Sequence, residues 1–172
     1  MQMVKRIIGG FFLSILLLWL LSPKQELYYL LEKELKKNGV IISNETFKDR
    51  WFGFVIENAD IYVKGAKMAQ VSKLEFNLFF FYNTLELKEI KTNDAIHNVA
   101  PKDISEMLIK YSVLDPLKVN IDSKGSFGVA TGAVELINRK VKILLPVVKD
   151  IKVFRKFLKK DKTEGWKYET NY

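Results

Sequence analysis

The chain has 172 residues, a formal net charge of +8, 48% hydrophobic residues, no cysteine and one histidine. This length suits one modest domain with an appendage. The absence of cysteine excludes disulfides, cysteine-ligated zinc or iron–sulfur sites and thiol catalysis, and a single histidine excludes a histidine-rich metal site. The composition therefore predicts a non-enzymatic protein without a cofactor.

Residues 1–22 are predicted to form a transmembrane signal-anchor. No charged residue lies between Ile7 and Leu21, and two basic residues precede this run. A run of this hydrophobicity favours insertion into a bilayer, and Pro23 follows it as a helix stop. The predicted anchor residues are Ile7, Phe11, Phe12, Leu16, Leu17, Trp19 and Leu20.

A cleaved secretory signal peptide is the alternative interpretation of this segment. Cleavage requires small residues at positions −1 and −3, but near the end of the run only Ser22 is suitable, with the bulky Leu20 two residues before it. The uncleaved anchor predicts a single-pass protein of the bacterial inner membrane. The short N-terminal head would then stay in the cytoplasm, and residues 23–172 would lie in the periplasm.

The residues after Pro23 predict a short amphipathic helix of about 13 residues. Its leucines recur at helical spacing, and Asn38 and Gly39 supply a stop signal. This helix either packs on its own domain or lies on a membrane surface. The predicted apolar stripe consists of Leu27, Leu30, Leu31 and Leu35.

From Val40 onward the hydrophobic period changes to two, which predicts a mainly antiparallel sheet with short connections. The clearest strand runs from Met68 to Tyr82, with a turn expected at Asn83–Thr84. Because alternate residues of a strand face opposite sides, the aromatic run 79–82 cannot lie on one face. Either a helix of the same domain covers the second face, or a partner or lipid does. The candidate partner or lipid surface consists of Leu74, Phe76, Leu78 and Phe80 on one face, with Phe79 and Phe81 on the other.

A second helix is predicted over residues 101–112, because apolar residues recur there at helical spacing after Pro101. Strands follow at 117–122 and 140–145, and between them a strand punctuated by Gly125, Gly128 and Gly132 ends at 133–137. Asn138–Arg139 is predicted to be a two-residue turn. A third, basic amphipathic helix is predicted to start at Pro146, before a short edge strand at 165–169. The expected organisation is an anchor at 1–22, a sheet domain at 23–145, and a helix and edge strand at 146–172 that belong to the same domain.

The excess positive charge lies in one C-terminal segment. Residues 139–162 carry ten Lys or Arg against two Asp, whereas residues 1–138 carry 17 basic and 16 acidic residues. Such a patch is either a solvated face or a site for lipid headgroups or an acidic partner. The preponderance of Lys over Arg argues against nucleic acid. The candidate patch consists of Lys149, Lys152, Arg155, Lys156, Lys159 and Lys160.

Three features together resemble the N component of type II secretion systems and the wider AsmA-like group. These features are the N-terminal anchor followed by a leucine-rich helix, the strand phrase at residues 78–90, and the glycine-punctuated hairpin at residues 125–136. The resemblance implies an inner-membrane-anchored periplasmic protein whose curved sheet has an apolar inner face. It implies no catalytic residues. The expected fold class is α+β: one N-terminal transmembrane helix, then a curved, mainly antiparallel sheet with short flanking amphipathic helices.

The sequence and the resemblance predict a non-enzymatic structural component of a trans-envelope machine. This would be a protein like the secretion N component, or an accessory scaffold of a flagellar motor, acting by tethering and protein–protein contacts. The alternative is an AsmA-like lipid-binding or transfer protein that uses the apolar sheet face. The expected partners are the inner membrane and other subunits of the complex, with phospholipid in the lipid-binding alternative, and not nucleic acid. His97 is expected to be a surface loop histidine.

Overall fold

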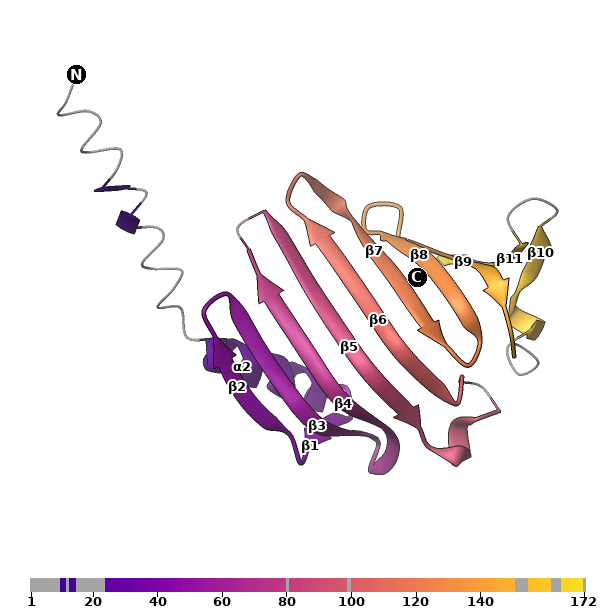
Figure 1. Ribbon diagram of the computed structural model, residues 1–172, viewed down its shortest axis with the longest axis horizontal. Helices are drawn as coiled ribbons and strands as arrows, with labels where there is room; N and C mark the ends of the chain where they lie inside the picture. The colour runs from indigo at the N-terminus through magenta and orange to yellow at the C-terminus, as the bar shows by residue number, and fades with distance from the viewer. Residues whose placement is uncertain are drawn as a thin grey trace, which may run out of the picture.

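The computed structural model describes residues 10–11, 13–14, 24–79, 81–98, 100–150, 155–161 and 165–171. Within these ranges, one eleven-stranded antiparallel sheet carries a helix, α2 (Lys24–Lys37), against its N-terminal strands (Figure 1). The strands are β1 (Val40–Ser43), β2 (Thr46–Arg50), β3 (Gly53–Val63), β4 (Ala66–Leu78), β5 (Tyr82–Thr92), β6 (Asp103–Ser112), β7 (Asp115–Gly125), β8 (Gly128–Glu135), β9 (Lys140–Val148), β10 (Lys159–Asp161) and β11 (Gly165–Asn171). Short 3₁₀ helices lie at Asp94–Ile96 and Arg155–Phe157.

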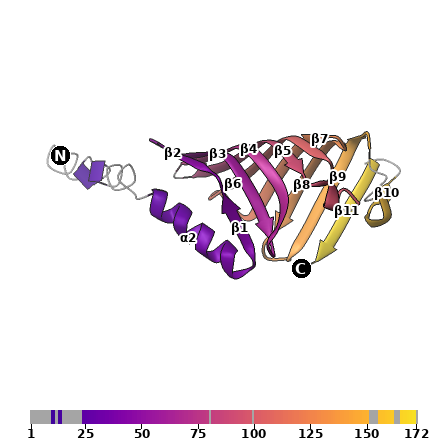
Figure 2. The same ribbon diagram turned by 90° about the horizontal axis from the view of Figure 1, so that it is seen from below.

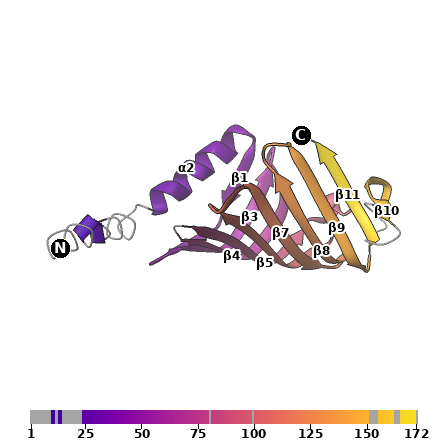
Figure 3. The same cartoon turned by 90° about the horizontal axis from the view of Figure 1, so that it is seen from above.

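The strands from β3 to β9 form a meander in which each strand pairs with the next. At one end of the sheet, β1 and β2 both pair with β3, and at the other end β11 pairs with β9 and carries β10 at its edge. Figures 2 and 3 show that the sheet bends into an arch, with α2 on the inner side of one flank and β9 and β11 curving toward that same side at the other flank. The sheet therefore has a concave inner face and a convex outer face.

The inner face is apolar from one flank of the arch to the other. In an antiparallel sheet, residues directly opposite one another share a face. The pairing therefore builds an unbroken row of inner-face residues across eight strands. This row consists of Phe54, Phe76, Leu85, Ile109, Ile121, Gly132, Ile143 and Tyr168.

A line of backbone irregularities crosses the N-terminal half of this sheet. Asn58 in β3 and Glu89 in β5 both have positive φ angles, of 57° and 52°. They lie in the same row across the sheet, because the residues on either side of each pair with the same two residues of β4, Val71 and Lys73. Residues in this conformation interrupt the strict alternation of a strand. As a result, Ile56 and Ala59 are both buried in the inner core although three positions separate them.

The helix α2 is anchored by Tyr28, which is 2% exposed and packs against Phe47 and Phe54. Its hydroxyl donates a hydrogen bond to Glu45, 3.0 Å away. Burial, followed by this bond to Glu45, raises the pKa of the Tyr28 hydroxyl. Two members of the predicted leucine stripe do not provide this contact, because Leu30 and Leu31 are 61% and 50% exposed.

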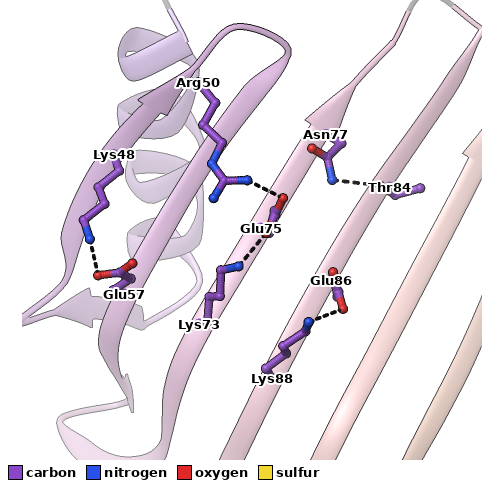
Figure 4. A network of polar contacts seen from close by, with 9 residues as sticks. All are labelled: Lys48, Arg50, Glu57, Lys73, Glu75, Asn77, Thr84, Glu86 and Lys88. Carbon is purple, nitrogen blue, oxygen red and sulfur yellow. Dashed lines mark hydrogen bonds and ion pairs between the residues drawn. The ribbon is translucent and has the colours of Figure 1, made fainter.

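The outer face carries charged side chains that pair along and across the strands (Figure 4). Glu75 in β4 accepts from Lys73 at 2.6 Å and from Arg50 at 2.7 Å, and Lys48 lies 2.6 Å from Glu57. The same kind of pairing continues toward the C terminus through Lys110–Asp122, Lys124–Glu106 and Lys140–Glu169. The two faces of the arch are therefore opposite in character.

We expect Glu75→Gln to lower the free energy of unfolding at pH 7 by about 1 kcal/mol. The hydrogen bond from Lys73 is the main cause that holds the pKa of Glu75 below its ordinary value of 4.5. The ionised carboxylate therefore stabilises the fold above pH 4.5, and this stabilisation is lost as the pH falls through the lower folded-state pKa. Urea denaturation of both proteins from pH 7 to pH 3 checks this, since the difference between them should shrink with the pH. A difference that stays constant over this range would contradict it.

The predicted transmembrane anchor is contradicted by the structure. Among the described residues, no helix is long and apolar enough to cross a membrane. The fold class with one transmembrane helix, and the localisation as a single-pass inner-membrane protein with a periplasmic body, are corrected by this finding. Of the predicted anchor residues, only Phe11 is described, and it is 63% exposed. The others, Ile7, Phe12, Leu16, Leu17, Trp19 and Leu20, lie outside the described residues.

Two of the predicted flanking helices are also wrong. The segment predicted as a helix at 101–112 is strand β6, paired on both sides. The helix predicted from Pro146 is not present where the chain is described, because β9 continues to Val148 and residues 155–157 form only one 3₁₀ turn. The expected turn at Asn83–Thr84 lies within β5 instead, while the expected turn at Asn138–Arg139 does separate β8 from β9.

Candidate binding groove

A cavity of about 450 Å³ lies in the C-terminal half of the inner face. Its volume is within the range of small-molecule binding sites. Its floor is formed by residues of β6 to β9 and β11. Phe157 and Leu158, which lie between β9 and β10 in the chain, line one side. The apolar residues of this groove include Ile104, Met107, Ile121, Phe127, Ile143 and Leu145.

The groove is the part of the inner face that α2 does not cover. Tyr28 of α2 packs with Phe54, Ile56, Val71 and Ile90, which belong to β3, β4 and β5. A second cluster, built on Phe127 and Leu145, begins where the first ends, and Ile104 packs against both. Within the part of the chain that the structure describes, one continuous apolar face is therefore covered at its N-terminal end and open at its C-terminal end.

Small residues make room in the groove floor. Ala130 and Gly132 of β8 lie between larger residues of β7 and β9, with Gly132 opposite both Ile121 and Ile143. A side chain at position 132 would meet the neighbouring strand, because an added Cβ would lie 2.8 Å from the carbonyl oxygen of Lys142. The hollow thus follows from the absence of side-chain volume at the middle of the C-terminal half.

One polar group lies in this apolar floor. Ser123 lines the groove and is 7% exposed, and its Oγ has no hydrogen-bond partner among the described residues. A buried hydroxyl without a partner costs free energy, so such a group is typical of a place that a ligand or water completes. The groove floor is therefore apolar around this one hydroxyl, whose oxygen is itself buried.

Two cationic side chains lie over aromatic rings beside the groove. The Arg155 guanidinium is 5.1 Å from the centre of the Trp166 ring, and the Lys156 ammonium is 5.0 Å from the centre of the Phe157 ring. Trp166 packs against the Phe127–Leu145 cluster, and Phe157 lines the groove itself. This arrangement places positive charge at the edge of an apolar hollow, which suits a molecule with an apolar chain and an anionic end.

The structure divides the six residues of the predicted apolar surface. Leu74 and Phe76 lie on the inner face, packed against the cluster around Tyr28, and Leu78 is half-buried at the end of β4. Phe79 and Phe81 lie in the β4–β5 turn and are 49% and 65% exposed, with Phe79 stacked on Phe52 at 5.1 Å. Phe80 lies outside the described residues. These residues are thus not the open part of the apolar face.

The predicted basic patch is partly placed at the groove. Arg155 and Lys156 are the two members beside it, whereas Lys159 and Lys160 are exposed on β10 at the sheet edge and Lys149 follows β9. Lys152 lies outside the described residues. The alternating residues 165–169 belong to β11, which pairs on both sides and is not the edge strand.

His97 lies in the loop between β5 and β6, where both of its ring nitrogens have polar neighbours. Its Nδ1 is 3.1 Å from Asp94, and its Nε2 is 3.2 Å from the carbonyl oxygen of Thr92. Among the described residues, no group of three or more histidine, aspartate or glutamate side chains is arranged to hold a metal ion.

Sequence reasoning missed the groove residues of β7 to β9, above all Ile121, Ser123 and Ile143. The alternation of Leu117, Val119 and Ile121 was a sufficient signal that this face is apolar. No local signal shows which part of this face α2 covers.

Comparison of the chain with protein-family models, with curated proteins and with solved structures finds no match. The resemblance to the secretion N component and the AsmA-like group therefore stays a prediction.

Proposed function

We propose that the protein is a non-enzymatic lipid-binding protein that holds an acyl chain in the groove of its inner face. The observation that carries this proposal is the open, apolar half of the arch, lined by side chains such as Ile121, Ile143 and Leu145. Leaving such a surface in water is unfavourable at roughly 25 cal/mol per Å² of apolar area. An acyl chain that lies along the floor would remove this cost.

The polar groups of the site support an amphipathic ligand rather than a pure hydrocarbon. Arg155 and Lys156 supply positive charge at the edge of the apolar groove. A carboxylate or a phosphate would satisfy these groups equally well. The ligand class is therefore an anionic lipid, either a fatty acid or a phospholipid.

A scaffold role is the alternative, and the edges of the sheet favour it less. Strand addition requires a long, unprotected edge. Here β1, β2 and β10 have four, five and three residues, and β10 carries Lys159 and Lys160. Contacts through the strand edges would thus be short and would meet charged side chains.

Native mass spectrometry of the full chain, purified without detergent, tests the proposal. We expect a co-purified lipid, whose mass distinguishes a fatty acid from a phospholipid. Ile121→Lys should lower binding of a pyrene-labelled acyl lipid by at least about tenfold, because it places a charge in the groove floor. Asn120→Lys is the matched control, since the adjacent residue of β7 faces the outer side and is exposed.

The scaffold alternative gives a different result in the same measurement. A protein that works only by contacts with other proteins would show the mass of the chain without lipid. The Ile121→Lys and Asn120→Lys variants would then bind the labelled lipid equally. Thermal melting of both variants separates lost binding from lost folding.

A further inference from the structure

Four hairpin tips at one end of the sheet carry exposed apolar side chains. Because β2 to β9 run antiparallel in sequence order, the β2–β3, β4–β5, β6–β7 and β8–β9 turns all lie at the same end, at the upper ends of the hairpins in Figure 1. Trp51 is 77%, Leu114 85% and Ile137 69% exposed. We call this end the apolar rim, and its members used below are Trp51, Phe79, Phe81, Val113, Leu114 and Ile137.

The opposite end of the sheet is different. The described residues of its turns and connections are 38–39, 64–65, 93–98, 100–102, 126–127 and 149–150, and within these ranges no large hydrophobic side chain is exposed. Phe127 is the one large aromatic among them, and it is buried against Leu145. Exposure of apolar tips is therefore a property of one end and not of turns in this sheet generally.

The spacing of the tips suits a fluid surface. Successive tips of the rim are two strands apart, which is about 10 Å at the usual strand spacing. The apolar side chains therefore form separate points along a line of roughly 30 Å. A protein partner would need a matching row of pockets, whereas lipid headgroups part around each point, and Trp is favoured at the membrane interface.

The charges beside the tips have both signs. Asp49 and Arg50 precede the first tip, Asp115 follows the third, and Glu135 and Arg139 flank the fourth. A rim of mixed charge gains little from an anionic surface, so its binding energy must come from burial of apolar side chains. This distinguishes the rim from the basic patch near the C terminus.

The rim is continuous with the inner face. Leu117 lies near the rim end of β7, and Leu136 directly follows β8. They are 47% and 43% exposed, and the Leu136 N–H donates a backbone hydrogen bond of 2.8 Å to Leu117. They share the parity of Val119 and Val134, so they point to the concave side. An apolar path therefore leads from the rim tips to the groove.

We infer that the apolar rim docks on a lipid bilayer, with the hairpin tips in the interface and the arch standing on its end. This docking uses the rim alone and no membrane-spanning helix. It goes beyond the proposed lipid binding and does not depend on it, because the rim and the groove floor use different residues.

The absence of cysteine from the sequence allows one site at a time to be labelled. The full chain carries an environment-sensitive dye attached through Ile137→Cys at the rim or through Lys102→Cys at the opposite end. The vesicles are phosphatidylcholine with brominated acyl chains. We expect strong quenching of the dye at position 137 and little at position 102, with a weak dependence on salt.

A pair of charge variants measures the contribution of the tips. Leu114→Asp, read through the dye at position 137, should weaken vesicle binding by at least about tenfold, because a charge replaces an inserted apolar side chain. Asn98→Asp adds the same charge at the exposed opposite end and should change nothing.

Each of three results would overturn the docking. These are no vesicle binding, equal quenching at positions 137 and 102, and a response of the rim dye that increases with protein concentration in the absence of vesicles. The last result would indicate association between copies of the chain. Ile121→Lys should leave rim quenching intact, so failure of lipid binding in the groove can be told from failure of docking.

Discussion

Replacing Phe54 by alanine is expected to lower the free energy of unfolding by about 3–5 kcal/mol. Phe54 is 4% exposed and stacks on Phe47 and Phe76, with ring centres 5.3 Å away in both cases. It also meets the edge of Tyr28, the residue that attaches α2. Its removal would therefore leave a cavity between the helix and the sheet and weaken the docking of α2.

Trp51→Ala is the matched control for Phe54→Ala. Trp51 is also aromatic and lies three residues earlier, but it is 77% exposed at the rim. Its removal should change the free energy of unfolding by no more than about 0.5 kcal/mol. Urea denaturation followed by circular dichroism measures both variants. Equal losses would show that Phe54 is not the centre of the N-terminal core.

The strand content could be predicted from alternation, but a backbone irregularity within β6 led to the wrong prediction of a helix there. Ile104 and Met107 both face inward although three positions separate them, because the register between β6 and β7 shifts between Ile104 and Glu106. A spacing of three between apolar residues is typical of a helix. A bulge within a strand produces the same spacing, so residues 101–112 appeared helical.

The helix predicted from Pro146 failed for a related reason. Val147 and Val148 are β-branched and extend β9 beyond the proline, while Val148 pairs with Gly128. β-Branched residues favour strands over helices. The later apolar residues recur at helical spacing, and this spacing carries no signal that Phe157 and Leu158 lie on the groove.

The apolar character of the groove could be predicted from the sequence, but the residues that come together in it could not. Alternation in β7 and β9 indicates an apolar face, but Ile121 and Ile143 come together only through Gly132 of the strand between them. Arg155 and Trp166 meet through a β10–β11 connection whose spacing carries no signal. Residue pairs of this kind depend on the register and on the curvature of the whole sheet.

Gly128→Ala is expected to destabilise the protein by about 3 kcal/mol or more, through backbone strain together with overpacking. Gly128 has a φ of +104°, and an added Cβ would lie 2.0 Å from the carbonyl oxygen of Val147. That atom belongs to the paired strand β9, so it cannot move without breaking the β8–β9 pairing. Because Phe127 precedes Gly128 and belongs to the groove cluster, the variant should also weaken the lipid binding that we propose for the groove.

Gly65→Ala separates backbone strain from overpacking as causes of the lower stability of Gly128→Ala. Gly65 lies in the β3–β4 turn with a similar φ of +83°, but an added Cβ would meet nothing within 4 Å. It should therefore cost only the strain of the left-handed conformation, about 1–2 kcal/mol. Chemical denaturation of both variants gives the difference, which measures the contact with Val147. Equal losses would mean that the close approach of β9 to Gly128 does not constrain the strand, and the groove floor would then tolerate a side chain at its end.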